Sequence, residues 1–266
     1  NMIKPCLGYT PEQGAELFYQ SGLGGVDLIK DDELFGNTTI STVAGRLKAY
    51  HKAAKRLLDE TGKAPVYVVN ITDTPKRLRE NAKIAISEGA KAVMVNFVAT
   101  GLDAFFELTE EFGDELCFLA HYAGAGVMNS PMLGIAGPVL LGVLPRLAGA
   151  DSVMTMFSAN KDTPAMLECI QTVQKQKLPM GNLKPVMTAF GGGVTPMSVK
   201  GMLETFGKDI IMGVGGAIQG HPMGTTAGAK AVMDALIGTV NGLELDEIAC
   251  DSPELKAAID IWGANR

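Results

Sequence analysis

Short apolar runs alternate with longer amphipathic segments along the whole chain. Short apolar runs are typical of buried strands, and apolar positions spaced three and four residues apart indicate helices. The pattern predicts strands at residues 2–6, 25–28, 66–71, 92–96, 117–121, 152–156, 185–189 and 210–212. It predicts helices between and after them at residues 11–21, 41–61, 74–88, 102–112, 137–147, 163–176, 197–206 and 224–237, with an extra helix near 252–263.

Eight strands in strict alternation with eight helices predict an α/β fold, specifically a (β/α)8 TIM barrel. An open doubly wound sheet more often has roughly five to seven strands. The length of 266 residues suits one barrel, and no linker or charge block divides the chain, so residues 1–266 are predicted to form one domain. In such barrels the reactive groups follow the carboxyl ends of the strands, which is where candidate site residues are sought.

Composition narrows the classes of partner. The net charge is -6 and no basic stripe is visible, which argues against nucleic acid and against an anionic membrane surface. The longest uncharged stretch, residues 117–145, contains three prolines, so a membrane-spanning helix is not expected. Four cysteines without a Cys-x-x-Cys pair indicate reduced thiols in a cytoplasmic protein.

A charged segment follows the second predicted strand: Lys30, Asp31, Asp32 and Glu33. Carboxylates in a catalytic loop suit Mg²⁺, which prefers oxygen ligands, although such runs are also common in solvated turns. A protonated lysine beside these acids would repel the cation. The conflict disappears if Lys30 has reacted with CO2, because the resulting carbamate is itself an oxygen ligand.

Two glycine-rich segments follow the last two predicted strands. Gly191, Gly192 and Gly193 come after the seventh, and Gly215 and Gly216 after the eighth. Barrels commonly bind phosphate with these two loops, because glycine lets backbone N–H groups approach an anion closely. The sequence therefore predicts a small phosphorylated substrate.

Residues 24–33 resemble the activation segment of ribulose-bisphosphate carboxylase (RuBisCO) and the RuBisCO-like proteins. The resemblance implies that Lys30 is carbamylated and that Asp32 and Glu33 complete a Mg²⁺ site. It covers essentially the whole chain but only the barrel domain of the family. The family's N-terminal domain, which completes the active site of a neighbouring subunit, is absent from these residues. A homodimer is the assembly that the resemblance implies.

Residues 2–8 are similar to the family's Ile-Lys-Pro-x-Leu-Gly segment, which implies that Lys4 is the base that abstracts a proton to form an enediolate. A lysine can do this only if its pKa falls from about 10.4 towards neutrality. A lysine that merely caps the barrel end is the alternative. His121, which ends the fifth predicted strand, matches a family histidine near metal and substrate. A core histidine bonded to the backbone is its alternative.

Several positions depart from the carboxylase. Cys6, Tyr122 and Met154 stand where it carries a lysine, an arginine and a histidine, and Gly191 replaces a serine. These losses weaken a second phosphate site and the carboxylation machinery. Lys161 stands where the mobile-loop lysine would be, but the surrounding loop is shortened, so a surface role is favoured.

The sequence thus predicts a Mg²⁺-dependent enolase or isomerase of a phosphorylated ketone that does not fix CO2. Residues 96–103 and 121–131 resemble the 2,3-diketo-5-methylthiopentyl-1-phosphate enolases of methionine salvage, the leading candidate class. A true ribulose-bisphosphate carboxylase is one alternative. A non-catalytic barrel that serves as a binding or assembly module is the other.

Overall fold

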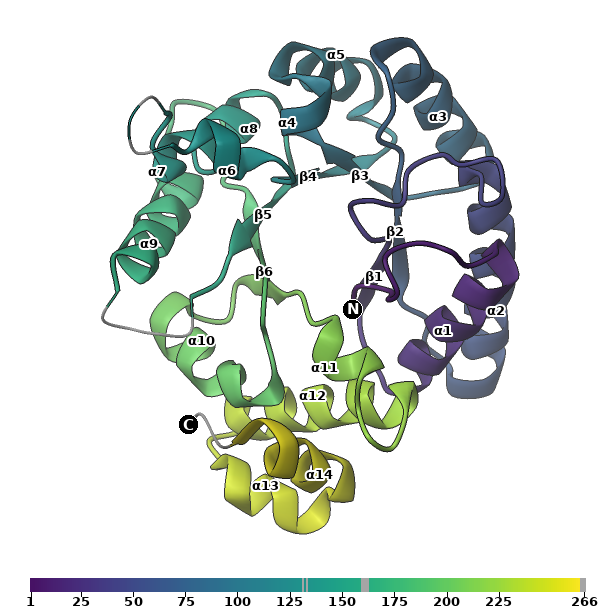
Figure 1. The fold of residues 1–266 in the computed structure, drawn as a ribbon, viewed down its shortest axis with the longest axis vertical. Helices are drawn as coiled ribbons and strands as arrows, with labels where there is room; N and C mark the ends of the chain where they lie inside the picture. The colour runs from purple at the N-terminus through teal and green to yellow at the C-terminus, as the bar shows by residue number, and fades with distance from the viewer. Residues whose placement is uncertain (131, 133, 159–162, 264–266) are drawn as a thin grey trace.

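A computed structural model describes residues 1–130, 132, 134–158 and 163–263. Its central element is a parallel sheet of seven strands, which lie side by side in the order of the sequence. Figure 1 shows these strands around a central axis with the helices outside them. The strands are β1 (Leu28–Lys30), β2 (Val66–Asn70), β3 (Ala92–Asn96), β4 (Cys117–His121), β5 (Ser152–Met156), β6 (Met187–Gly191) and β7 (Ile210–Met212).

The strands read as continuous apolar runs because helices cover one face of the sheet and the other face points inward. Four successive residues are buried at the carboxyl end of both β2 and β3. Burial on both faces is typical of parallel sheets. The sequence therefore predicted the α/β class and the repeated strand-helix order correctly.

The first predicted strand, at residues 2–6, is wrong in extent. Only Met2 forms a bridge, parallel to Lys30, and the chain then leaves the sheet. The N–H of Met2 donates to Val214 O at 3.2 Å, and the N–H of Ile3 donates to Lys30 O at 3.2 Å. Pro5 has no N–H to continue such a ladder. The segment that begins the chain thus lies between β1 and the residues that follow β7.

Two other predicted strands, at 25–28 and 185–189, are shifted by about two residues. Gly25 has a φ of 91°, which lies outside the strand region, so β1 begins only at Leu28. Pro185 lacks the donor that a ladder needs, so β6 begins at Met187. The shift places Lys30 and Gly191 as the last residues of their strands.

The helices that follow the strands are mostly as predicted. They are α1 (Pro11–Leu23), α2 (Val43–Thr61), α3 (Pro75–Ser87), α5 (Leu102–Phe112), α9 (Pro164–Lys177), α10 (Val199–Phe206), α12 (Thr225–Val240) and α14 (Pro253–Trp262). The helix predicted at residues 137–147 is instead two short ones, α7 (Gly137–Leu140) and α8 (Leu144–Leu147). Pro145 explains the break, because it cannot donate to a carbonyl in the preceding turn.

Some short elements had no signal in the periodicity. They are α4 (Phe97–Thr100), α6 (Ala125–Met128), α11 (Gly216–Gln219), α13 (Leu245–Asp251) and the 3-10 turn η1 (Pro196–Ser198). Most are single turns, too short to show a period. Among the described residues, no helix combines the length and the apolar character needed to cross a bilayer.

Candidate active site

Lys30 is the last residue of β1, and its side chain is only 7% exposed. Its Nζ donates to Asp31 O at 3.0 Å and lies 3.6 Å from Glu33 Oε2. Burial lowers the pKa of Lys30, against the opposing effect of the nearby carboxylates of Glu33, Asp32 and Asp31. A lowered pKa favours the neutral amine, which is the form that reacts with CO2.

Asp32 and Lys4 form an ion pair beside Lys30. Lys4 Nζ donates to Asp32 Oδ2, and the Leu34 N–H donates to Asp32 Oδ1 at 3.0 Å. Burial alone would raise the pKa of Asp32, but these two hydrogen bonds and the charge of Lys4 lower it. Burial tends to lower the pKa of Lys4, but the bond to Asp32 outweighs it, so the pKa of Lys4 is raised. In this arrangement Lys4 keeps its proton.

His121 ends β4 and faces the same cluster. Its Nε2 lies 3.7 Å from Glu33 Oε2, while its Nδ1 accepts the Ala123 N–H at 3.1 Å. Because Nδ1 is an acceptor, the proton of the neutral ring sits on Nε2, towards Glu33. Burial, with the charge of Lys30 next in size, lowers the pKa of His121 to about 3, so the ring is neutral near pH 7.

Two asparagines hold the backbone of the acidic segment in place. Asn70 Nδ2 donates to Asp32 O and Glu33 O, both at 3.1 Å. Asn96 Nδ2, from the end of β3, donates to Glu33 O at 2.8 Å. The two side-chain amides therefore hold the backbone of Asp32 and Glu33, the candidate metal ligands, in position. Asn96 Oδ1 remains buried without a hydrogen-bond partner among the described residues.

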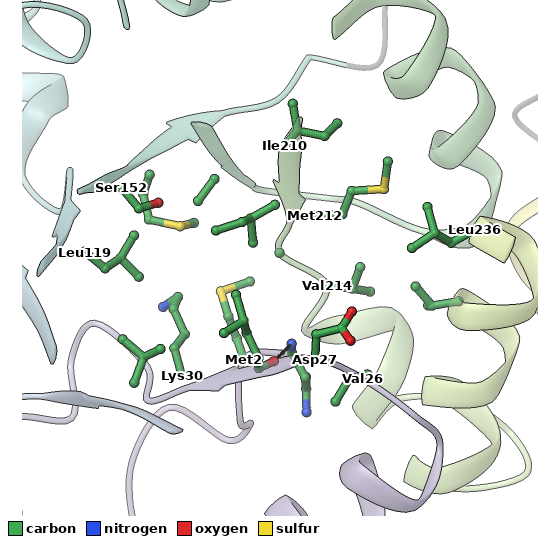
Figure 2. A pocket seen from close by; sticks show the side chains of 18 of the residues that line it. Met2, Val26, Asp27, Lys30, Leu119, Ser152, Ile210, Met212, Val214 and Leu236 are labelled. Atoms are coloured by element: carbon green, nitrogen blue, oxygen red, sulfur yellow. Dashed lines mark hydrogen bonds between the residues drawn. The ribbon is translucent and has the colours of Figure 1, made fainter. Parts of the chain in front are cut away.

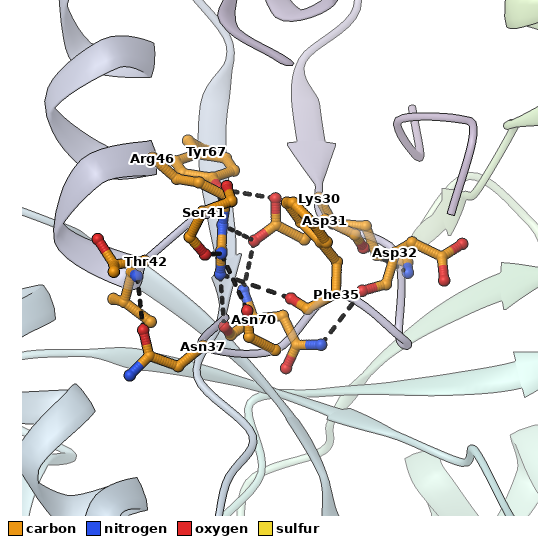
Figure 3. Close-up of polar contacts among 12 residues, drawn as sticks. Lys30, Asp31, Asp32, Phe35, Asn37, Ser41, Thr42, Arg46, Tyr67 and Asn70 are labelled. Carbon is orange, nitrogen blue, oxygen red and sulfur yellow. Dashed lines mark hydrogen bonds and ion pairs between the residues drawn. The ribbon is translucent and has the colours of Figure 1, made fainter. Parts of the chain in front are cut away.

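Asp31, the acid between the candidate ligands, is turned away from them into a buried polar network (Figure 3). Its Oδ2 accepts Arg46 Nε at 3.1 Å and the Asn70 N–H at 2.8 Å, and its Oδ1 accepts the Tyr67 hydroxyl at 2.7 Å. Arg46 is fully buried and also donates to Ser41 O at 2.6 Å. The network ties the loop after β1 to α2 and β2.

Sequence reasoning missed this network. One signal was available, because Arg46 stands on the buried face of α2 among Val43, Leu47 and Tyr50. A charged residue at an apolar position of a helix must find a partner, and Asp31 was the acid left over once Asp32 and Glu33 had been assigned.

The glycine segments lie on neighbouring strands, because β6 and β7 are paired. Gly191 ends β6, and Gly192 and Gly193 follow with φ of 88° and 73°. Positive φ is a conformation that side chains disfavour, which explains glycine at both positions. Gly215 and Gly216 follow β7, where α11 begins, and a Cβ on Gly216 would meet no atom within 4 Å. An anion could therefore approach the backbone N–H groups of these glycines closely.

The positions that depart from the carboxylase make apolar, stacking or hydrogen-bonding contacts. Met154 is buried, and its Cε would lie 2.6 Å from a Cβ on Gly191. Tyr122 stacks on His121 at 5.0 Å between ring centroids. Cys6 Sγ lies 3.3 Å from Lys4 Nζ. Lys161 lies outside the described residues. His221 accepts the Met223 N–H at 3.2 Å through Nδ1, and its Nε2 lies 3.0 Å from Glu254 O.

The side chains of Lys30, Asp32 and Glu33 suit a hard cation only after the present lysine–carboxylate ion pairs are broken. Among the described residues, no group of three or more histidine, cysteine or acidic side chains is already placed to hold a metal ion. Asp32 and Glu33 instead face the ammonium groups of Lys4 and Lys30. If Lys30 became a carbamate, three oxygen groups would stand together, with the unpartnered Asn96 Oδ1 close to the loop that carries them. This donor set fits Mg²⁺.

A parallel α/β fold with a buried lysine, two carboxylates and a histidine at the carboxyl ends of its strands is typical of enzymes that keep their reactive groups at that end. The sequence profile of the ribulose bisphosphate carboxylase large chain, catalytic domain, matches residues 1–262. The chain belongs to this family.

Its relatives include RuBisCO-like proteins. A ribulose bisphosphate carboxylase-like protein of Archaeoglobus fulgidus is 36% identical over 91% of this chain and 56% of its own length. The 2,3-diketo-5-methylthiopentyl-1-phosphate enolase of Bacillus pumilus is 34% identical over 99% of this chain and 65% of its own length. The crystal structure of a RuBisCO-like protein, MtnW, from Alicyclobacillus acidocaldarius superposes with a TM-score of 0.91 at 35% identity, over 98% of this chain and 65% of that one. The chain thus spans less than two thirds of the length of these relatives.

Proposed function

We propose that this chain is the catalytic barrel of a RuBisCO-like enolase, which moves a proton within a phosphorylated ketone with the help of Mg²⁺ and does not fix CO2. The observation that carries the proposal is the convergence of Lys4, Lys30, Asp32, Glu33 and His121 within hydrogen-bonding or near-contact distance of one another. They come from three separate parts of the chain and meet after the strands, where barrel enzymes keep their reactive groups.

The proposed substrate is 2,3-diketo-5-methylthiopentyl-1-phosphate. Relatives from Bacillus pumilus and Exiguobacterium sibiricum, 34% and 31% identical, bear the name of the enolase for this compound. The buried Met154 beside Gly191 supports a substrate with one phosphate, because this part of the site offers a thioether rather than a cation. Gly191, Gly192, Gly193, Gly215 and Gly216 are proposed to hold that phosphate through backbone N–H groups.

Lys30 as its carbamate, Asp32 and Glu33 are proposed to hold the metal. A bound Mg²⁺ would polarise the substrate carbonyl and so make the neighbouring C–H more acidic. Burial lowers the pKa of Lys30, which supports carbamate formation, because only the neutral amine attacks CO2.

Lys4 is proposed to take the proton from the carbon beside the carbonyl. Its pairing with Asp32 raises its pKa, so Lys4 can act as a base only once Asp32 has been drawn into another interaction. His121, neutral and with its proton on Nε2, is proposed to donate a hydrogen bond to a substrate oxygen, since its Nδ1 is already taken by Ala123.

Two structural proposals accompany this function. Residues 1–266 form one closed (β/α)8 barrel, in which the segment that begins at Asn1 takes the eighth strand position, between β1 and β7. The hydrogen bonds from Met2 to Val214 and from Ile3 to Lys30 support this. The working unit is a homodimer. Structures similar to this chain include a dimeric RuBisCO of Hyperthermus butylicus and an octameric one of Pyrococcus horikoshii, with TM-scores of 0.90 and 0.92.

A true carboxylase is the second candidate, because relatives named ribulose bisphosphate carboxylase, such as that of Pyrococcus abyssi, are 34% identical. Cys6, Tyr122 and Met154 count against it. Uptake of labelled CO2 into ribulose bisphosphate would favour this candidate over the enolase.

The test is calorimetric titration with Mg²⁺ or Mn²⁺, with and without bicarbonate, on the wild type, Lys30→Ala and Lys63→Ala. Lys63 is an exposed lysine paired with Asp27, so its variant controls for loss of one positive charge. We expect bicarbonate to tighten metal binding in the wild type and Lys63→Ala but not in Lys30→Ala. Binding that ignores bicarbonate in all three proteins would refute the carbamate. Exchange of a substrate carbon-bound proton for deuterium, followed by NMR, then tests enolisation itself.

A further inference from the structure

The inward-facing side chains of the strands differ from one part of the sheet to another. Figure 2 shows Leu119 of β4 and Ser152 of β5 directed into the interior space, and Met154 and Ala189 line the same space. Successive side chains of a strand point to opposite faces, so every second residue shares that direction. The inward positions at the carboxyl ends can therefore be assigned strand by strand.

On β1 to β4 the last inward position of each strand is polar. These positions hold Lys30, Asn70, Asn96 and His121, each the final residue of its strand. All four side chains contact the acidic segment that follows β1. This part of the carboxyl end therefore carries the candidate metal ligands and the groups that position them.

On β5 and β6 the last inward positions carry no polar side chain. β5 ends at Met156 and β6 at Gly191, and these two residues are paired in the sheet. Met154, two positions before Met156, is buried, and its Cε lies 2.6 Å from the place that a Cβ on Gly191 would take. Met154 thus fills the floor on this side, and Met156 stands one layer nearer the carboxyl end.

Met156 is exposed although it is apolar and takes an inward position. Its exposed fraction is 60%, against 3% for Met154. Its Cγ lies 3.7 Å from the place that a Cβ on Gly192 would take, and Gly192 belongs to the glycine segment after β6. On the other side β5 pairs with β4, the strand that ends at His121. The exposed thioether therefore stands between the histidine and the glycine segment.

The order of the strands arranges the parts of the proposed substrate. The glycine segments follow β6 and β7, and the candidate metal ligands follow β1. The edges of β1 and β7 are joined through Met2, which bridges to Lys30 and donates its N–H to Val214 O. In 2,3-diketo-5-methylthiopentyl-1-phosphate the phosphate-bearing carbon is likewise next to a carbonyl carbon. With these two groups held by β6, β7 and β1, the other end of the molecule extends towards β4 and β5.

We propose that Met156 is a specificity-determining residue, which forms with Met154 an apolar ridge that binds the uncharged thioether tail of the substrate. The inference rests on the proposed function, because that function supplies the positions of the phosphate and the carbonyl. Methionine is flexible and polarizable, so its side chain adapts to an apolar chain of this kind. A second phosphate in the same place would instead lose water against the two apolar side chains of the Met154–Met156 ridge.

Binding of simple phosphates tests the ridge without any need for catalysis. Three probes are titrated into the 266-residue chain by calorimetry without divalent metal: 5-methylthiopentyl phosphate, ethyl phosphate and pentane-1,5-diyl bisphosphate. We expect the wild type to bind 5-methylthiopentyl phosphate roughly tenfold more tightly than ethyl phosphate, because the longer tail buries additional apolar surface. The bisphosphate should gain nothing from the ridge.

Three variants then locate the effect. Met156→Lys should abolish the preference for the thioether tail and bind the bisphosphate roughly tenfold more tightly than the wild type does, through a charge-assisted contact. Met156→Leu keeps an apolar side chain and should retain the preference. The matched control is Leu58→Lys, at a position on α2 that is 54% exposed, and it should change none of the three affinities. Equal Tm values for Met156→Lys and the wild type show that the variant is folded.

A wild type without the tail preference, or a Met156→Lys variant that keeps it, would overturn the inference. Failure of all three phosphates to bind would also overturn it, because the tail reaches the ridge only from an anchored phosphate. Deuterium exchange at the substrate carbon reports separately on the proposed function. Exchange without a tail preference would leave the enolase and remove the ridge, whereas a tail preference without exchange would refute enolisation and leave an apolar binding subsite.

Discussion

Asp31 accepts hydrogen bonds from Arg46, Tyr67 and Asn70, and of these three partners Arg46 alone carries a positive charge. Replacing Arg46 with methionine removes that charge. Methionine keeps a long apolar stem, so the change removes charge and hydrogen bonds with little loss of volume. Arg46 and Asp31 are both 0% exposed. Asp31 would be left as a buried carboxylate that only two neutral donors contact.

Breaking a buried pair by removing one partner typically costs about 3–5 kcal/mol, because the remaining charge is desolvated and uncompensated. Arg46 also donates to Gly36 O at 3.0 Å and Ser41 O at 2.6 Å, which fasten the loop after β1. We therefore expect the free energy of unfolding to fall by about 3–5 kcal/mol, and the Tm by roughly 6–20 °C for a chain of this size.

Urea unfolding followed by far-UV circular dichroism measures this loss. Arg77→Met is the control, because Arg77 is exposed on α3 and should leave the midpoint unchanged. Asp31→Asn added to Arg46→Met should recover part of the stability, since no buried charge then remains. A loss for Arg46→Met no larger than that for Arg77→Met would refute the reasoning.

The loss should also depend on pH. Burial raises the pKa of Asp31, against the lowering effects of Arg46, Tyr67 and Asn70. Without Arg46 the pKa of folded Asp31 rises further above its unfolded value. A carboxyl whose pKa is raised by folding takes up a proton on folding, so it favours the folded state as the pH falls. The stability difference between wild type and Arg46→Met should therefore shrink from pH 7 towards pH 5, and an unchanged difference would contradict an ionised, unpaired Asp31.

Three further substitutions test other parts of the fold, each by thermal and urea unfolding. Gly193→Ala should lower the free energy of unfolding by about 1–2 kcal/mol, because the φ of Gly193 is 73°. Gly216→Ala is the control and should cost less, because a Cβ there meets open space and φ is not positive. Equal losses for the two variants would count against backbone strain at Gly193. Arg146→Met should cost about 3 kcal/mol, because buried Arg146 donates to the carbonyls of Lys184 and Leu183 at 2.7 and 2.8 Å; an unchanged midpoint would show that these bonds add nothing. Phe118→Ala should cost about 3–5 kcal/mol, since its ring is 1% exposed and packs edge-on against Phe105; a loss below about 1 kcal/mol would mean that the core collapses around the gap.

The order of strands and helices could be predicted from the sequence, because it depends on the local periodicity of apolar residues. Segments such as Ala92–Asn96 and Leu102–Phe112 were predicted to the residue. Errors fell where a backbone constraint outweighed the apolar pattern, as at Gly25, Pro145 and Pro185. The charged segment at Lys30 was found because four consecutive ionisable residues after a strand are conspicuous in one dimension.

Which side chains meet was decided only by the tertiary structure. Nothing in the chain order places Lys4 against Asp32, His121 against Glu33 or Arg46 against Asp31, since these contacts join residues from different strands and helices. The different surroundings of Asp31 and Asp32 were likewise decided by the tertiary structure. The two acids are adjacent, but successive side chains at a strand end point in opposite directions, so one enters a buried network and the other faces the site. Periodicity encodes the elements, whereas pairing, burial and pKa depend on packing between elements that are distant in sequence.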